Sequence, residues 1–127
     1  MELSELKFTE THEWLHPEGD LVRMGISDFA QNELGDIVFV ELPQVGDTIT
    51  KGMTLCTVES VKAVSDVYAP VSGTVKEVNI TLEDSPEKVN ESPFDDGWMI
   101  IIELSDAGEL EKFMNEAAYR EKIDQAG

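Results

Sequence analysis

The sequence is divided into short runs rich in Val, Ile and Thr, and this feature most constrains the fold. Glycine, proline, aspartate and asparagine interrupt the runs every few residues, as is typical of antiparallel β proteins. We therefore expect a mainly β fold. The predicted strands cover residues 12–15, 20–26, 37–42, 53–61, 64–69, 72–80 and 98–104.

Two regions are predicted to be helical. Ser27 is a favoured N-cap residue, and Asp28 follows it at the positive end of the helix dipole. Gly35 can adopt the left-handed conformation that ends a helix, so a short helix is expected near 27–34. After Ser105, apolar residues recur at helical spacing and predict C-terminal helices packed on the sheet: Leu110, Phe113, Met114, Ala117, Ala118 and Tyr119.

Two segments resemble each other and suggest an internal duplication. Residues 45–52 (VGDTITKG) and 71–78 (VSGTVKEV) each pass through a turn into a strand, and we interpret Gly52 and Gly73 as turn glycines. Two half-units on either side of residues 61–63 would place that segment at the tip of the connecting hairpin. Chance similarity between two short β segments is the alternative.

Size and charge narrow the class of protein. With 127 residues, 41% of them hydrophobic, the chain can build one compact core, and we expect a single domain over residues 1–127. The 27 acidic residues against 9 Lys and Arg give a formal charge of −18. Such a surface repels nucleic acid and anionic lipid but suits basic protein faces. Neither an apolar span nor a signal segment is found, so we expect a cytoplasmic protein.

Cys56 is the only cysteine. No disulfide can form within the chain, and a reducing compartment fits this composition. The residue lies in an apolar strand segment, without a positive charge or a helix start beside it in the sequence. We expect a buried and unreactive thiol.

The segment His12-Glu13-Trp14-Leu15-His16 matches the zinc-peptidase string H-E-x-x-H. That string binds a metal only on a helix, where residues four apart lie on one side. Here Pro17 follows directly and residues 18–20 form a predicted turn. In a strand the two histidines would lie roughly 13 Å apart. We therefore expect no metal site, and a short strand with Trp14 in the core.

Lys62 lies in the short connection Val61-Lys62-Ala63 between two predicted strands. A turn at this point would project the lysine side chain into water. Position alone does not distinguish Lys62 from any other solvated lysine. The residues around Lys62 do distinguish it from other lysines, because they match the sequence pattern of a known family.

Outward from Glu59-Ser60-Val61-Lys62-Ala63, the sequence closely resembles the H proteins of the glycine cleavage system. The resemblance extends over nearly the whole chain, and it implies a lipoyl-domain-like barrel-sandwich hybrid with an N-terminal extension and C-terminal helices. The matching segments are residues 11–14, 25–31, 34–43, 45–47, 65–73, 89–93 and 97–98.

The resemblance also implies a function. In the family, the lysine that matches Lys62 is joined by an amide to lipoic acid. A pyridoxal-phosphate glycine decarboxylase loads an aminomethyl group on this arm, a folate-dependent aminomethyltransferase removes it, and dihydrolipoamide dehydrogenase reoxidises the arm. The protein would then be a carrier without catalytic activity of its own, acting as a monomer.

Further residues acquire expected roles through the resemblance. Glu13 and Asp66 are the carboxylates expected to receive the ammonium end of the loaded arm when it folds against the protein. Charge-assisted hydrogen bonds of about 1.5 to 3 kcal/mol would hold the arm without trapping it. A lipoylating enzyme is expected to recognise the residues around the lysine, which are Glu59, Ser60, Val61 and Ala63.

Two related kinds of carrier fit the sequence less well. A biotin carrier usually presents its lysine between two methionines, whereas Val61 and Ala63 flank Lys62. A lipoyl domain of a 2-oxoacid dehydrogenase would have flexible linkers rich in Pro and Ala, which this chain lacks. An H-like protein that mainly relays lipoyl groups to other enzymes remains the open alternative.

Overall fold

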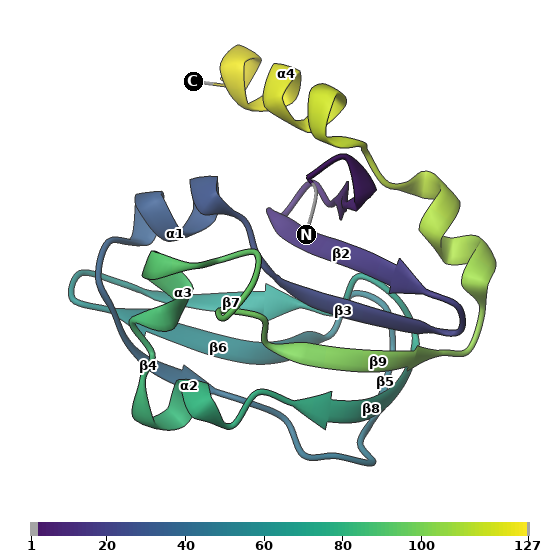
Figure 1. Cartoon of the computed structure of the whole chain (residues 1–127), viewed down its shortest axis with the longest axis horizontal. Helices are drawn as coiled ribbons and strands as arrows, with labels where there is room; N and C mark the ends of the chain where they lie inside the picture. The colour runs from purple at the N-terminus through teal and green to yellow at the C-terminus, as the bar shows by residue number, and fades with distance from the viewer. Residues whose placement is uncertain (1–2, 127) are drawn as a thin grey trace.

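The structure, a computed structural model, describes residues 3–126 and is built on two antiparallel sheets (Figure 1). One sheet has the strand order β1-β2-β3-β9-β8-β5, and the other has the order β4-β6-β7. The mainly β prediction is thus confirmed. The strands are β1 (Lys7–Phe8), β2 (Glu13–Glu18), β3 (Leu21–Ile26), β4 (Ile37–Glu41), β5 (Thr48–Ile49), β6 (Thr54–Ser60), β7 (Val64–Tyr68), β8 (Gly73–Val78) and β9 (Ile100–Leu104).

Each predicted strand is present, but β2 is longer than expected. It continues through Pro17 to Glu18, so the predicted turn at 18–20 begins one residue later than expected. Strand β1 pairs only with Trp14 and Leu15, so Pro17 lies beyond the end of β1, where its missing N–H costs little. The strands β1 and β5 were not predicted, because two residues are too few to show an alternating pattern.

The short helix α1 (Asp28–Leu34) forms as predicted. Ser27 caps it, because its hydroxyl oxygen accepts the N–H of Ala30 at 3.1 Å. Gly35 ends the helix with φ of 81°, in the region that favours glycine. Within the described residues, no helix is long and apolar enough to cross a bilayer.

The predicted C-terminal helices are present but interrupted. A 3-10 helix, η2 (Ala107–Lys112), is followed by α4 (Glu116–Ala126). Between them Met114 pairs with Phe8 through two backbone hydrogen bonds of 2.7 and 3.0 Å. The helical apolar spacing across this break was therefore misleading. Three further short helices were not predicted: η1 (Leu3–Glu5), α2 (Thr81–Asp84) and α3 (Lys88–Glu91).

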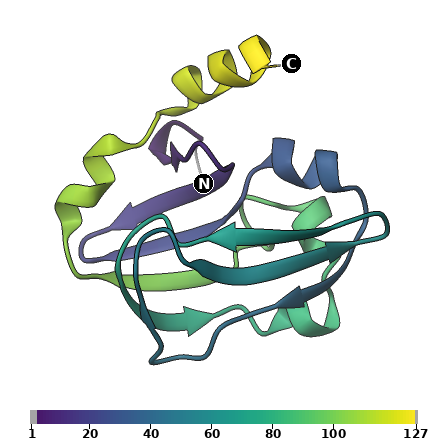
Figure 2. The same ribbon diagram turned by 180° about the vertical axis from the view of Figure 1, so that it is seen from behind.

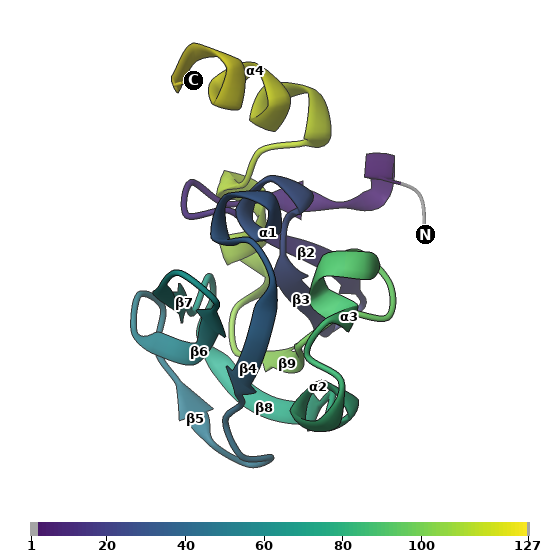
Figure 3. The ribbon, with the colours of Figure 1, turned by 90° about the vertical axis from the view of Figure 1, so that its left-hand side faces the viewer.

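The apolar residues form two clusters. The larger one fills the space between the two sheets and contains Cys56, which is 4% exposed, and burial raises the pKa of its thiol to about 12. The thiol is therefore buried, as predicted, and its raised pKa disfavours the reactive thiolate. The smaller cluster lies under α4 and contains Leu6, Phe8, Trp14 and Tyr119. Figure 3 shows α4 on the outside of the molecule, above α1 and the β2 end of the larger sheet.

The two similar segments of the sequence lie side by side. Residues 45–52 contain β5 and residues 71–78 contain β8, and these strands pair antiparallel, with Thr48 opposite Thr74. Gly52 has a φ of 93° and is a turn glycine as expected. Gly73, in contrast, begins β8. Residues 61–63 connect β6 to β7 and lie at the tip of that hairpin, as predicted.

Candidate functional site

The side chain of Ser60 organises the turn at the tip of the β6–β7 hairpin. Its hydroxyl oxygen accepts the backbone N–H of Ala63 at 3.1 Å and that of Lys62 at 3.3 Å. The N–H of Ser60 donates to the carbonyl of Ala63 at 2.8 Å and closes the turn. Val61, Lys62 and Ala63 are all exposed, so the tip presents the lysine to solvent as predicted.

The hairpin tip is attached to the segment that joins α1 to β4. The N–H of Val61 donates to the carbonyl of Asp36 at 3.0 Å, and Figure 2 shows this segment passing beside the tip. A Cβ atom on Gly35 would lie 3.7 Å from Cε of Lys62, so the lysine stem runs over the end of α1. No ion pair among the described residues involves Lys62. Its side chain is exposed to solvent.

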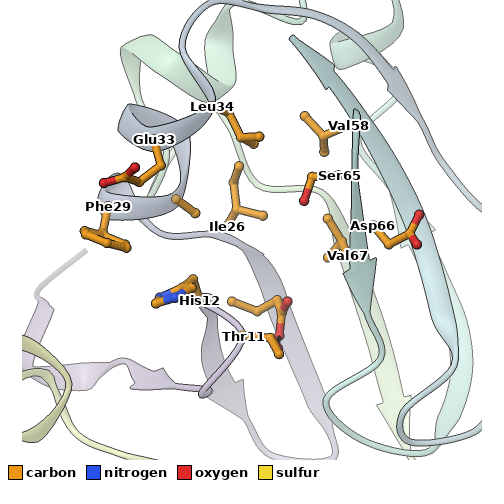
Figure 4. A pocket seen from close by; sticks show the side chains of 12 residues that line it. Thr11, His12, Ile26, Phe29, Glu33, Leu34, Val58, Ser65, Asp66 and Val67 are labelled. Carbon is orange, nitrogen blue, oxygen red and sulfur yellow. Dashed lines mark hydrogen bonds between the residues drawn. The ribbon is translucent and has the colours of Figure 1, made fainter. Parts of the chain in front are cut away.

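A cavity of about 440 Å³ opens beside α1, between this helix, the start of β2 and the strand β7 (Figure 4). Helix α1 lines the cavity and also supports the stem of Lys62 at its end. Leu34 at the end of α1 lines the cavity, and Gly35 directly after it lies beside the lysine stem. The lining residues are Thr11, His12, Glu13, Ile26, Phe29, Ala30, Glu33, Leu34, Val58, Ser65, Asp66 and Val67.

Glu13 places a buried carboxylate in this cavity. The residue is 2% exposed, and its Oε1 accepts the hydroxyls of Thr9 at 2.7 Å and Thr11 at 2.5 Å. Burial raises the pKa of Glu13, although these hydroxyls and the backbone N–H of Tyr68 act in the opposite direction. Among the described residues no ion pair involves Glu13. A buried carboxylate with donors but without a cation is a suitable partner for a cationic group.

Asp66 occupies the edge of the cavity and is exposed. In Figure 4 its carboxylate points away from the other lining side chains, whereas Ser65 and Val67 point toward them. The structure therefore does not bring the carboxylates of Glu13 and Asp66 together inside the cavity. Ser65 was missed in the sequence. Because alternate residues of a strand share a face and Val67 is buried, Ser65 could have been assigned to the inner face.

His12 and His16 do not form a shared site. His12 precedes β2, and its Nδ1 lies 2.8 Å from the hydroxyl of Tyr119. His16 belongs to β2 and lies 3.3 Å from Oε2 of Glu5. Within residues 3–126, no group of three His, Cys, Asp or Glu side chains is arranged to hold a metal ion. The string H-E-x-x-H lies at the start of strand β2 and not on a helix, as the sequence predicts.

Apolar side chains surround the hairpin tip. Val61 is 69% exposed and Val64 is 65% exposed, on either side of Lys62. On the outer face of the smaller sheet, Glu59 lies between Val64 and the exposed Phe39, because it pairs with both. Exposed branched and aromatic side chains that lie together are typical of a contact surface.

These features define a class of protein, namely a barrel-sandwich hybrid that presents a lysine at a hairpin tip beside a cavity with a buried carboxylate. The model of the glycine cleavage H-protein family matches residues 6–126. The chain belongs to the glycine cleavage H-protein family.

Individual relatives agree with this assignment. A glycine cleavage system H protein of Halalkalibacterium halodurans is 57% identical, over 96% of this chain and 95% of the relative. One of Bacillus licheniformis is 58% identical, over 95% of both chains. The crystal structure of a glycine cleavage system H protein from Mycobacterium marinum is 34% identical and superposes with a TM-score of 0.87, covering 95% of this chain and 98% of that one. The similar structure confirms the predicted barrel-sandwich fold.

Proposed function

We propose that Lys62 carries a lipoyl group and that the chain shuttles an aminomethyl group derived from glycine between enzymes. The observation that carries the proposal is the exposed Lys62 at a hairpin tip in a chain of this family. The bound group would supply a dithiol that is loaded, unloaded and reoxidised. The chain itself supplies the amine, its position and a surface for the arm, and catalyses none of these steps.

The residues at the tip fit such an attachment. Lys62 has a primary amine on a long stem, which an acylating enzyme can join as an amide, and arginine could not replace it in this reaction. Ser60 fixes the turn through its hydrogen bonds to Lys62 and Ala63. The flanking Val61 and Ala63 are exposed and, together with Glu59, offer a surface for the lipoylating enzyme.

Glu13 is proposed to hold the ammonium end of the loaded arm within the cavity. Its carboxylate is buried and already accepts hydrogen bonds from the hydroxyls of Thr9 and Thr11. A cationic group beside it would balance its negative charge. The apolar lining would exclude water from the arm, at about 0.8 kcal/mol for each buried methylene. Asp66 at the edge of the cavity would attract the cation at its entrance. Loss of the amine would remove the charged contact and release the arm.

The proposed partners are the pyridoxal-phosphate glycine decarboxylase, the folate-dependent aminomethyltransferase, dihydrolipoamide dehydrogenase and the lipoylating enzyme. Family membership and the formal charge of −18 support partners with basic docking faces. We place the protein in the cytoplasm, as a single monomeric carrier domain over residues 1–127. A role as a lipoyl relay to other enzymes is the second candidate, and it uses the same lysine.

Intact mass and peptide mapping of protein from lipoylating cells test the proposal. We expect a lipoyl increment confined to the peptide that contains Lys62. The variant Lys62→Arg should lose the increment and all carrier function, while its unfolding free energy stays within about 0.5 kcal/mol of the parent, because the residue is exposed. Lys76→Arg, at an exposed position of β8, is the matched control and should be lipoylated normally. Modification elsewhere would contradict the assignment.

A further inference from the structure

The C-terminal helix α4 contacts both sides of the cavity although none of its residues lines it. One side is α1, and the other is the turn of residues 9–12 that leads into β2. The hydroxyl of Tyr119 lies 2.7 Å from Oγ of Ser27, the N-cap of α1, and 2.8 Å from Nδ1 of His12. A single side chain therefore joins the two sides.

Arg120 and Lys122 strengthen the same arrangement. The guanidinium of Arg120 donates to both carboxylate oxygens of Asp28, in the first turn of α1, at 2.8 and 3.1 Å. On the other side, Nζ of Lys122 lies 3.0 Å from Glu10. A bidentate arginine pair fixes relative orientation better than a single contact does. The ring of Tyr119 is held in turn by stacking on Phe8 at 4.5 Å.

His12 has an unusual backbone at this junction. Its φ is 71°, in the left-handed region that residues other than glycine adopt only at a cost in energy. Among the described residues, it is the only residue other than glycine with a positive φ. Its N–H donates to Thr9 at 3.3 Å, and its carbonyl accepts the N–H of Ser27 at 2.9 Å. The contact with Tyr119 adds a third restraint on this residue.

The rings of His12 and Phe29 form a wall of the cavity. Their centroids lie 4.9 Å apart, and both rings also line a smaller cavity of about 240 Å³ on the side of α4. Tyr119 and Lys122 line that smaller cavity as well. Helix α4 thus covers the outer side of the wall, while the inner side faces Glu13.

From these contacts we propose that Tyr119 and Arg120 are positioning residues that set the width of the arm cavity by holding α1 and His12 together. The inference rests on the proposed function, because it assigns α4 to the protection of the loaded arm. When the contacts to α4 are lost, α1 and the 9–12 turn separate more often, and water reaches the cargo beside Glu13.

The variant Tyr119→Phe tests this inference, because it removes the hydroxyl and keeps the ring that stacks on Phe8. In the unmodified chain, hydrogen–deuterium exchange should rise at residues 11–13 and 29–34 by about fivefold, as expected for a hydrogen bond of about 1 kcal/mol. Exchange in β6 and β7 should stay unchanged. In the lipoylated and loaded protein, hydrolysis of the cargo should accelerate by about the same factor. Glu121→Gln, at an exposed position of α4, is the control and should leave both rates unchanged.

The variant Glu13→Gln separates this inference from the proposed function. Faster hydrolysis in Glu13→Gln with unchanged rates in Tyr119→Phe would overturn the positioning role and leave the sheltering cavity in place. Unchanged hydrolysis in both variants would reject the sheltering cavity and, with it, the role of α4. If Tyr119→Phe does not fold, judged by near-UV circular dichroism, Arg120→Gln carries the same test through the loss of its pair with Asp28.

Discussion

At the scale of residues, Glu13 combines a cost in folding with the functional role proposed for it. Its carboxylate is buried at some cost in free energy, and the hydroxyls of Thr9 and Thr11 offset part of that cost. The burial of Glu13 could not be predicted from the sequence. Burial depends on β7, which supplies the N–H of Tyr68 from more than fifty residues away in the chain.

Glu13 gives the unmodified protein a pH-dependent stability. Because its pKa is raised by burial, the folded state binds a proton more tightly than the unfolded state does. The contribution of this group to stability is therefore full below its unfolded pKa and is lost as the pH rises through its folded pKa. Relative to the parent, Glu13→Gln should gain unfolding free energy across that interval. Urea denaturation from acidic to neutral pH measures the difference, and a parent that gains on the variant with rising pH would refute the assignment.

Cys56 makes a second prediction at this scale. Its thiol is 4% exposed, its pKa is raised to about 12, and it lies 4.0 Å from Sδ of Met99 in the larger core. The native protein should not react with a thiol reagent at neutral pH, and reaction should follow unfolding. Labelling rates measured across a urea titration check this. Rapid labelling in the absence of urea would show that the strand opens locally.

At the scale of elements, the close packing of β9 against β8 leaves no room for a side chain at Gly73. A Cβ on Gly73 would lie 2.1 Å from the carbonyl oxygen of Glu103 in β9, far closer than atoms can approach. Gly73→Ala should therefore destabilise the protein by about 3 kcal/mol or more, because β8 and β9 must separate. Thermal or urea unfolding measures the loss. Thr74→Ala, at the next and exposed position, should change stability by less than about 0.5 kcal/mol.

The longer elements were predictable and the shorter ones were not. Runs rich in Val, Ile and Thr, bounded by turn residues, located β3, β6, β7 and β9. Ser27 with Gly35 located α1, because these signals are local. The helices α2 and α3 have four residues each, which is about one turn and shows no helical period. The prediction of Gly73 as a turn residue was wrong, because its close contact with the backbone of β9 leaves no signal in the local sequence. The same applies to the cavity, whose walls come from distant segments of the chain.

At the scale of the whole molecule, charge should govern how quickly partners find the hairpin tip. A formal charge of −18 attracts basic faces over distances comparable to the Debye length, about 10 Å at 0.1 M salt. Association with each proposed partner enzyme should slow by about tenfold or more between low and high salt. Stopped-flow measurements check this. A rate independent of salt would exclude electrostatic steering.

Local variants can distinguish steering at the tip from a general effect of charge. Glu59 lies on the hairpin that bears Lys62, whereas Glu111 lies in η2, at the opposite end of the molecule (Figures 1 and 2). Glu59→Gln should lower the association rate and its salt dependence, and Glu111→Gln should have little effect. Equal effects of the two variants would mean that net charge alone matters.

The hydrogen bond from Val61 to Asp36 has a final consequence. This bond restrains the hairpin tip, so for the proposed lipoyl arm on Lys62 the reach of the tethered group would be set mainly by the length of the arm. Each proposed partner enzyme would then have to bring its reaction centre inside one small sphere around the tip. Large enzymes could not share such a volume, so they would have to take turns, and an excess of any one of them would slow the others.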